Sequence, residues 1–335
     1  MILIKAPLRL SFFGGGSDIP THFLTHGGAT LSATFDKFVY VSLMRTPQPH
    51  IKVAYSSTEY ANTLEDVRHD IVRESLREYK ISSHLEISSF ADIPTVGTGL
   101  GASSAFTVAL VAGLERLTQP PEVTWSIPSP YHLVRQAVKI ELDRTKSPIG
   151  YQDHIAAAYG GLLLAEYFPQ KSNPDDPFTV QRLFTRVSTL SLFDCLFLVK
   201  MPNRRLSANV ILSGGMQSAQ VQRLTQIAKY AKNCIQQNDI STFGKLLHEC
   251  WQLKKQANSN VTTPEIDAIY QRSIDAGVLG GKLLGAGGGG HLLLCAQTPE
   301  HKAELQREVF ANDTWYNVAL TQTGAEVVYD DTRKL

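Results

Sequence analysis

Three glycine-rich segments constrain the fold of this chain more than any other feature of its sequence. They are Gly14 to Asp18, Gly97 to Ser104 and Gly285 to Gly290. Glycine loses more backbone freedom on folding than any other residue, so a cluster of glycines needs a reason. A tight turn at a strand end is the ordinary reason. The alternative is a loop whose backbone N–H groups press against phosphate, where side chains would obstruct the contact.

The middle segment gives the stronger argument for phosphate. It leads directly into a predicted helix from Ser103 to Leu117, which is apolar on every face and therefore expected in the core. A helix N-terminus offers free N–H groups and the positive end of a dipole. Ser103 and Ser104 can add hydroxyl groups for a phosphate oxygen or a magnesium ion, although either can instead be an N-cap. We expect this loop to bind phosphate.

Two common nucleotide-binding signatures lack their usual context. The stretches that begin at Gly97 and Gly285 both match the dinucleotide pattern G-x-G-x-x-G/A. Pro94 separates the first from its strand, and the second precedes a strand instead of a helix, so neither indicates a Rossmann unit. No glycine run is followed by the G-K-[ST] of a Walker A loop. A nicotinamide-dependent oxidoreductase remains an alternative.

Two acidic residues can supply chemistry beside the phosphate loop. Glu141 lies near the end of a predicted helix, and Asp153 follows the turn Pro148-Ile149-Gly150. This turn can bring both carboxylates to one cleft. Phosphoryl transfer needs a magnesium ion to neutralise phosphate charge and a carboxylate near the nucleophile. Taken alone, each acid is more often a solvated or capping residue.

Composition argues against several other classes of function. A net charge of +1 and a pI of 7.7 are not typical of a nucleic-acid or membrane surface. No apolar stretch is long enough to span a membrane, and the N-terminus does not have the pattern of a signal peptide. Four scattered cysteines indicate buried thiols in a reducing compartment: Cys195, Cys234, Cys250 and Cys295. We expect a cytoplasmic protein.

Hydrophobic patterns predict a mixture of strands and helices. Strands are expected at 2–6, 29–45, 50–55, around 85–87, 195–200 and 292–296. Helices are expected at 103–117, 131–144, around 156–159, 217–236, 240–256 and 264–275. The chain length suggests two domains, with a soft boundary near residue 190.

Taken in order, the motifs resemble those of the GHMP kinases, named for galactokinase, homoserine kinase, mevalonate kinase and phosphomevalonate kinase. The motifs are A-P-x-R with G-G-G-S-D, then G-L-G-A-S-S-A, a Glu before G-x-Q-D, and K-L-L-G-A-G-G-G-G. Within the family, the D-glycero-D-manno-heptose 7-phosphate kinases also share Q-D before A-A-A-Y-G-G, and W-x-L-K. The resemblance spans most of the chain, from Lys5 to about Leu294.

The resemblance implies an α/β (α+β) fold with two domains. Residues 1–190 would form an N-terminal ribosomal-protein-S5-like domain that binds ATP, and residues 191–335 a ferredoxin-like C-terminal domain. The active site would lie in the cleft between them.

The resemblance also implies roles for individual residues. Asp153 and Arg9 would be catalytic, the first accepting or orienting the proton of the sugar hydroxyl and the second stabilising charge at the nucleophile. Mg²⁺ would bind Glu141 and Ser103, with Ser104 as the alternative hydroxyl. The ATP phosphates would contact Gly97, Gly99, Leu100, Gly101, Ala102, Ser103 and Ser104. The sugar substrate would contact Gly15, Gly16, Asp18, Gly287, Gly288 and Arg205.

The implied reaction is transfer of phosphate from ATP to the anomeric hydroxyl of D-glycero-D-manno-heptose 7-phosphate, which gives the 1,7-bisphosphate for nucleotide-activated heptose. Another aldose 1-kinase, of the fucokinase or galactokinase type, and a non-catalytic sugar sensor are alternatives. Galactokinases have Glu-His where this chain has Gly15-Gly16, which argues against galactose. The partners expected are a sugar phosphate and ATP, with neither nucleic acid nor membrane, and a homodimer is a possible assembly.

Two further features of the sequence bear on the substrate and its site. The phosphate of the substrate needs a cationic anchor, and the candidates by charge are Arg204, Arg205, Lys254, Lys255 and Lys282. His154 stands where an amide is common after the catalytic aspartate, so it departs from the family pattern.

Overall fold

The computed structural model describes residues 1–94, 97–120, 126–170, 176–183, 187–202 and 216–331. One sheet contains β1 (Ile2–Phe13), β2 (Gly28–Arg45), β3 (Ile51–Ala54), β4 (Thr58–Ala61), β5 (Leu85–Ala91), β6 (Leu162–Tyr167), β7 (Phe178–Arg182) and β12 (Glu326–Asp330). A second sheet contains β8 (Leu196–Met201), β9 (Gly280–Leu283), β10 (Gly290–Cys295) and β11 (Trp315–Asn317).

The first sheet is built around two long strands. Its order is β12-β1-β2-β5-β3-β4, with β6 pairing β2 and β7, and only β3 and β5 among the described pairs run parallel. The 18 residues of β2 pair with β1, then with β5 at one end and β6 at the other. Its burial is continuous in the first half and alternating in the second, so one strand serves both a fully covered and a half-covered part of the sheet.

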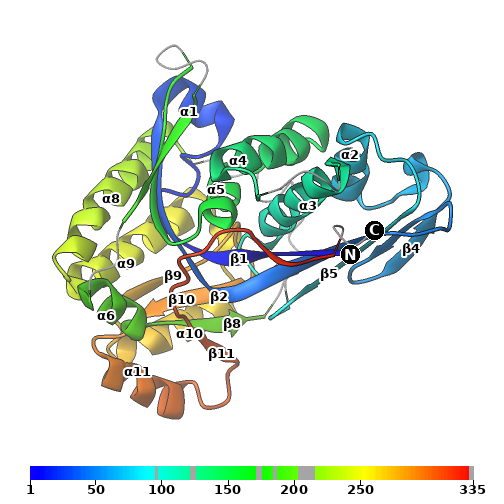
Figure 1. The fold of residues 1–335 in the computed structure, drawn as a ribbon. Helices are drawn as coiled ribbons and strands as arrows, with labels where there is room; N and C mark the ends of the chain where they lie inside the picture. Colours follow the sequence, from blue (N-terminus) through cyan, green and yellow to red (C-terminus); the bar gives the residue numbers. More distant parts are fainter. Residues whose placement is uncertain (95–96, 121–125, 171–175, 184–186, 203–215, 332–335) are drawn as a thin grey trace.

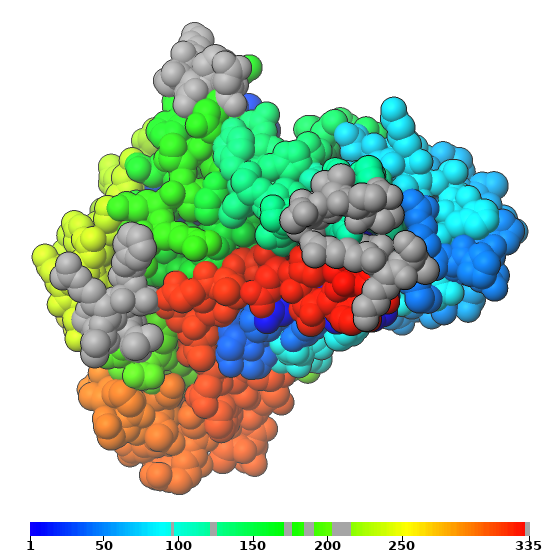
Figure 2. Space-filling model, in the orientation of Figure 1, coloured from blue at the N-terminus to red at the C-terminus, as the bar shows by residue number. Residues whose placement is uncertain are grey.

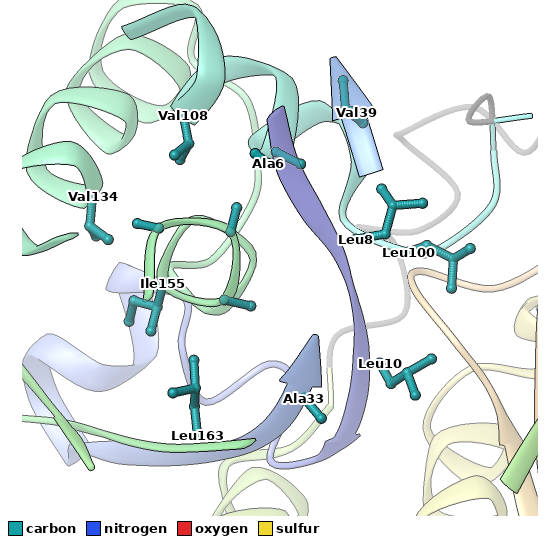
Figure 3. Packing of buried hydrophobic residues seen from close by; sticks show 14 of the residues in the cluster. Ala6, Leu8, Leu10, Ala33, Val39, Leu100, Val108, Val134, Ile155 and Leu163 are labelled. Carbon is teal, nitrogen blue, oxygen red and sulfur yellow. The ribbon is translucent and has the colours of Figure 1, made fainter. Parts of the chain in front are cut away.

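Helices from the first half of the chain cover one face of this sheet (Figure 1). They are α1 (Pro20–His26), α2 (Asp70–Glu78), α3 (Ala102–Thr118), α4 (Pro130–Val138) and α5 (Gln152–Tyr159). Figure 3 shows Val108 of α3, Val134 of α4 and Ile155 of α5 converging on one side of β1, with Leu8 and Leu100 on the other. Because β1 is covered on both sides, almost all of its residues are buried.

The second sheet has the order β11-β8-β10-β9 and is antiparallel throughout. The helices in this later part of the chain are α6 (Val187–Cys195), α8 (Ser218–Gln236), α9 (Ile240–Ala257), α10 (Pro264–Asp275) and α11 (Pro299–Glu304). Helix α9 packs on β9, whereas α8 reaches across to β2 of the first sheet. Contacts of this kind hold the two sheets against each other.

The end of the described chain returns to the first sheet. Strand β12 pairs antiparallel with β1, so the two termini lie close together (Figure 1). In the space-filling view the C-terminal segment, coloured red, runs across the front of the molecule (Figure 2). The division into 1–190 and 191–335 stays a prediction, although β12 belongs to the sheet of the first half rather than the second.

Two predicted elements differ from the observed ones for identifiable reasons. The first strand does not stop before Pro7 but continues to Phe13, because the pairing with β2 shifts register between Pro7 and Arg9, and such an irregularity accommodates proline. The helix predicted over 131–144 ends its α-helical part at Val138 and continues as a π-helical segment from Lys139 to Arg144. Such π-helical segments often occur at functional sites.

Two other expectations concern the thiols and the membrane. All four cysteines are free and buried, as predicted. Within the part of the chain that the structure describes, none of the helices combines the length and apolarity needed to cross a bilayer.

Candidate active site

A cavity of about 1420 Å³ joins the glycine loops of the two halves. Its walls include the Gly97–Ser103 segment, the Leu284–Gly287 segment and Gly289, and the side chains of Arg9 and Asp153. The second and third glycine segments of the sequence therefore meet at one place. Backbone N–H groups without side chains in front of them suit a phosphate-rich ligand.

The second and third glycine segments touch each other without room for side chains. Gly99 has a φ of +70°, and a Cβ there would lie 2.4 Å from the carbonyl oxygen of Leu284. Gly285 has the same φ, and its Cβ would lie 2.4 Å from the Cα of Gly99. Only glycine combines this backbone conformation with this approach. The two glycine loops therefore pack directly against each other and form one wall of the cavity.

Arg9 and Asp153 form a bidentate ion pair in this wall. The Arg9 Nε and Nη2 donate to Asp153 Oδ1 and Oδ2, each at 2.7 Å, and Nη1 donates to the carbonyl oxygen of Gly99. The Arg9 side chain is only 5% exposed, whereas that of Asp153 is 23% exposed. The arginine therefore serves as the buried clamp, and the carboxylate is presented to the cavity in a fixed orientation.

The segment Gly97–Gly101, which is predicted to bind phosphate, leads into the N-terminus of α3, and this N-terminus has no capping side chain. Helix α3 starts at Ala102, and its N-cap residue Gly101 is left-handed, with φ +74° and no side-chain hydrogen bond to the first turn. The N–H groups of this turn are therefore not satisfied by a capping side chain. Leu100 is buried, and its carbonyl oxygen accepts from the Arg9 N–H at 3.0 Å. This bond ties the phosphate loop to β1.

Ser103 and Glu141 place two hard oxygen donors together at this helix end. The Ser103 hydroxyl is in an exposed residue that lines the cavity, and it donates to Glu141 Oε1 at 2.5 Å. Ser104 is buried, so of the two hydroxyls considered it is Ser103 that faces the cavity. Mg²⁺ prefers carboxylate, hydroxyl and phosphate oxygens and takes few of them from the protein. The pair fits such an ion.

His154 holds the other oxygen of Glu141. Both side chains are buried, and His154 Nε2 donates to Glu141 Oε2 at 2.6 Å. Burial raises the pKa of Glu141, but the charge and hydrogen bond of His154, together with the hydroxyls of Ser103 and Ser104, outweigh it and lower the pKa below the usual value. Glu141 is thus kept ionised, as a cation ligand must be. The sequence marked His154 only as a departure from the family pattern.

Asp18 is buried at the end of the first glycine segment and is not among the residues that line the cavity. Its Oδ1 accepts from the Gly16 N–H at 2.9 Å and its Oδ2 from the Gln152 N–H at 3.1 Å. Burial raises the pKa of Asp18, and nearby Asp153 raises it further, although the two N–H groups act in the opposite direction. The Gln152 N–H is adjacent in sequence to Asp153, so Asp18 and Asp153 belong to one region of the structure.

We expect that Gly150→Ala displaces Asp18. A Cβ at Gly150 would lie 1.9 Å from Asp18 Oδ2, and overpacking of a buried site costs about 1–3 kcal/mol of unfolding free energy. Thermal denaturation should show a lower Tm. In an Asp18→Ala background the clash partner is absent, so the same Gly150 substitution should cost much less. Equal losses of Tm in both backgrounds would contradict the assignment.

Apolar and aromatic side chains also line the cavity, and the sequence did not predict them. Tyr55, His69, Phe90 and Phe106 line it together with Val39. They come from β2, β5, the end of β3, the residue before α2 and helix α3, so no local pattern in the sequence joins them. An apolar and aromatic lining of this kind suits a nucleotide base.

Only some of the remaining predicted residues line the cavity. Gly97 and Ala102 line the cavity, as does Gly287, whereas the N–H of Gly288 is already bonded to the carbonyl oxygen of Val261 at 2.8 Å. Gly15 and Gly16 flank Asp18 and are partly exposed. Arg204 and Arg205 lie outside the described residues. Their predicted role in binding the substrate phosphate stays a prediction.

Comparison with known proteins identifies two domains of one family. The N-terminal domain model of the GHMP kinases matches residues 66–161, and the model "GHMP kinases C terminal" matches residues 231–313. Together they cover more than half of the chain. Both halves of the cavity wall fall within or beside these two regions.

Individual relatives point the same way. The D-glycero-alpha-D-manno-heptose 7-phosphate kinase of Campylobacter jejuni is 24% identical over 87% of this chain and 88% of its own length. The bifunctional fucokinase/GDP-fucose pyrophosphorylase of Arabidopsis thaliana is 23% identical over 91% of this chain, which spans 31% of that protein.

Solved structures share the fold. The crystal structure of a D-glycero-D-manno-heptose 1-phosphate kinase from Bacteroides thetaiotaomicron superimposes with a TM-score of 0.77 at 23% identity, covering 98% of this chain and all of the other. The predicted two-domain kinase fold is thereby confirmed. The chain belongs to the GHMP kinase family and is a phosphotransferase with an alcohol group as acceptor, which uses ATP as the phosphate donor.

Proposed function

We propose that the protein transfers the γ-phosphate of ATP to the anomeric hydroxyl of D-glycero-D-manno-heptose 7-phosphate and forms the 1,7-bisphosphate. The observation that carries this proposal is that the Arg9–Asp153 pair and the uncapped start of α3 line one cavity, while buried Asp18 accepts a hydrogen bond from the residue before Asp153. The Campylobacter and Bacteroides relatives, both named as heptose kinases, support a heptose as the sugar.

Each group has a place in this reaction. The glycine loop at the start of α3 would hold the ATP phosphates, and Ser103 and Glu141 would hold the Mg²⁺. Mg²⁺, when bound, neutralises charge on the phosphates. Asp153 orients the sugar hydroxyl or accepts its proton, and Arg9 fixes the carboxylate and stabilises negative charge on the transferred group. Asp18 accepts a hydrogen bond from a further sugar hydroxyl.

The glycine triplet supports a large acceptor. Gly15 and Gly16 border the Asp18 site without side chains, and nothing lies within 4 Å of a Cβ added at Gly16. Open space at this position is available to an extended sugar. The fucokinase relatives make another aldose 1-kinase the alternative within the same reaction class.

The experiment is a coupled ADP-release assay over a panel of sugars. The panel contains D-glycero-D-manno-heptose 7-phosphate, the free heptose, fucose, arabinose and galactose. We expect release with the heptose 7-phosphate at a kcat/KM well above that for the others, and a product phosphorylated at C1 by ³¹P NMR. Highest activity with fucose would replace heptose by the alternative acceptor. No release with any sugar would favour a non-catalytic sensor.

A nucleotide titration tests the remaining alternative, a nicotinamide-dependent oxidoreductase. ATP with magnesium should bind and NADH should not, because the glycine segments lack the Rossmann context and the family is that of kinases. Tight binding of NADH without binding of ATP would contradict the proposal.

A further inference from the structure

His291 extends from the second sheet to the phosphate loop (residues 97–101). It lies in β10, directly after the third glycine segment, and its side chain is buried. Because a carbonyl oxygen can only accept a hydrogen bond, His291 Nδ1 is the donor to the carbonyl oxygen of Thr98, at 3.1 Å. Thr98 lines the cavity and His291 does not. The histidine therefore holds the phosphate loop from behind the cavity wall.

The second sheet fixes the position of the His291 ring. The backbone carbonyl oxygen of His291 accepts from the Leu284 N–H at 2.9 Å, and the ring packs on Tyr316 of β11 with centroids 5.6 Å apart. The buried Nε2 has no hydrogen-bond partner among the described residues, so a proton on Nδ1 alone leaves no buried ring N–H unpaired. Burial lowers the pKa of His291, against the effect of the bond to Thr98, and this favours the same neutral ring.

The carbonyl oxygens that follow Thr98 are held from the other side of the molecule. The Gly99 carbonyl oxygen accepts from Arg9 Nη1, and the Leu100 carbonyl oxygen accepts from the Arg9 N–H at 3.0 Å. Both donors belong to β1 of the first sheet. On the side of the second sheet, a Cβ added at Gly290 would lie 2.7 Å from the Thr98 carbonyl oxygen, so β10 approaches the loop closely. The loop is thus anchored between the two sheets.

The bond to His291 also sets the direction of an N–H group. In a planar trans peptide the C=O and the N–H point in opposite directions. Because the Thr98 carbonyl is directed to His291 behind the wall, the N–H of Gly99 is directed away from His291. Thr98 and Gly99 both line the cavity, and the Gly99 N–H donates to no acceptor among the described residues. This N–H is therefore available to a phosphate oxygen.

We propose that His291 is a positioning residue for the nucleotide, which holds the peptide group between Thr98 and Gly99 so that the Gly99 N–H faces the phosphates of ATP. The proposal rests on the ATP site of the proposed function and not on the identity of the sugar. It assigns the second half of the chain a part in phosphate binding through a side chain outside the cavity. Loss of the His291 donor would free this peptide group to rotate.

The test removes the donor while the ring is kept. His291→Phe has a ring of similar size without an N–H, and His291→Asn keeps a side-chain N–H. Calorimetry gives the Kd for ATP with magnesium and for adenosine, which has no phosphate. We expect His291→Phe to raise the Kd for ATP by roughly 10-fold, the effect of one hydrogen bond, and to leave the Kd for adenosine nearly unchanged. His291→Asn should recover part of the affinity for ATP.

His248→Phe is the matched control. His248 of α9 also bonds through Nδ1, to the hydroxyl of Tyr270 at 2.7 Å, and its ring stacks on that of Tyr270. Neither residue lines the cavity. This control should lower Tm without a change in the Kd for ATP. Thermal denaturation also identifies any variant that does not fold, and His291→Leu is a second variant without the donor.

The comparison of ATP with adenosine decides the proposal. A wild-type Kd for ATP in folded His291→Phe would overturn it, and so would equal losses for ATP and adenosine, because they would show a general disturbance of the nucleotide site. Wild-type protein that binds ATP no more tightly than adenosine would refute the phosphate loop and the proposal with it. A sugar panel without turnover would count against the proposed reaction alone, since the binding measurements need no sugar.

Discussion

Asp153→Asn is expected to lower kcat for phosphoryl transfer by about 10³-fold while leaving ATP binding nearly intact. The amide keeps the size of the side chain and can still accept one hydrogen bond from Arg9. It cannot take the proton of the sugar hydroxyl, and it leaves the buried guanidinium without its full counter-charge. The measurement is ADP release with the preferred sugar, combined with a fluorescence titration of ATP and magnesium.

The matched control for this variant is Asp143→Asn. Asp143 is exposed and lies on the segment that leads to the same turn, so its replacement should leave kcat unchanged. Full turnover by Asp153→Asn would remove this residue from the mechanism. Loss of ATP binding together with turnover would instead indicate that the ion pair with Arg9 holds the phosphate loop in place.

Gly99→Ala is expected to reduce kcat/KM by roughly 10²-fold, because it separates the two glycine segments that form the cavity wall. The new Cβ would lie 2.4 Å from the carbonyl oxygen of Leu284 in a left-handed backbone conformation. Neither the Gly99 segment nor the Leu284 segment can relieve this clash without displacing the loop that is expected to bind the phosphates. The loss should appear both in the Kd for ATP and in kcat.

Gly277→Ala separates backbone strain from the effect of the clash. Gly277 has a φ of +86°, but an added Cβ there meets the flexible end of the Gln297 side chain at 3.1 Å. This control carries a similar conformational cost of about 1 kcal/mol in unfolding free energy and should keep full activity. If Gly99→Ala retained wild-type kcat/KM, the contact between the glycine loops would have no role in the site.

Prediction from sequence was most successful where a pattern is local. The apolar run after the glycine loop predicted a helix over 103–117, and α3 spans Ala102–Thr118. The helix predicted over 264–275 is α10, and its start is marked locally by the N-cap hydroxyl of Thr263 and by Pro264 in the first turn. Pro148 and Gly150 likewise predicted the turn before Asp153.

Prediction was weakest where contacts join distant segments. The continuation of β1 beyond Pro7 depends on a register irregularity against β2, which no residue of β1 indicates alone. The pairing of β12 with β1 joins the two ends of the chain. The aromatic lining of the cavity is assembled from several elements, so its members have no spacing in common.

The kinds of loops and helices, and the chemical groups that they carry, could be predicted from the sequence, because glycine content, capping residues and apolar periodicity act through neighbouring residues. Which of these groups meet depends on the folded structure. It paired Arg9 with Asp153, turned Ser103 rather than Ser104 toward the cavity, set His154 against Glu141 and bonded Lys254 and Lys282 to backbone carbonyl oxygens. The physical reason is that charge pairing and close backbone approach depend on distances between segments that are far apart in the chain, and packing of the sheets and helices fixes those distances.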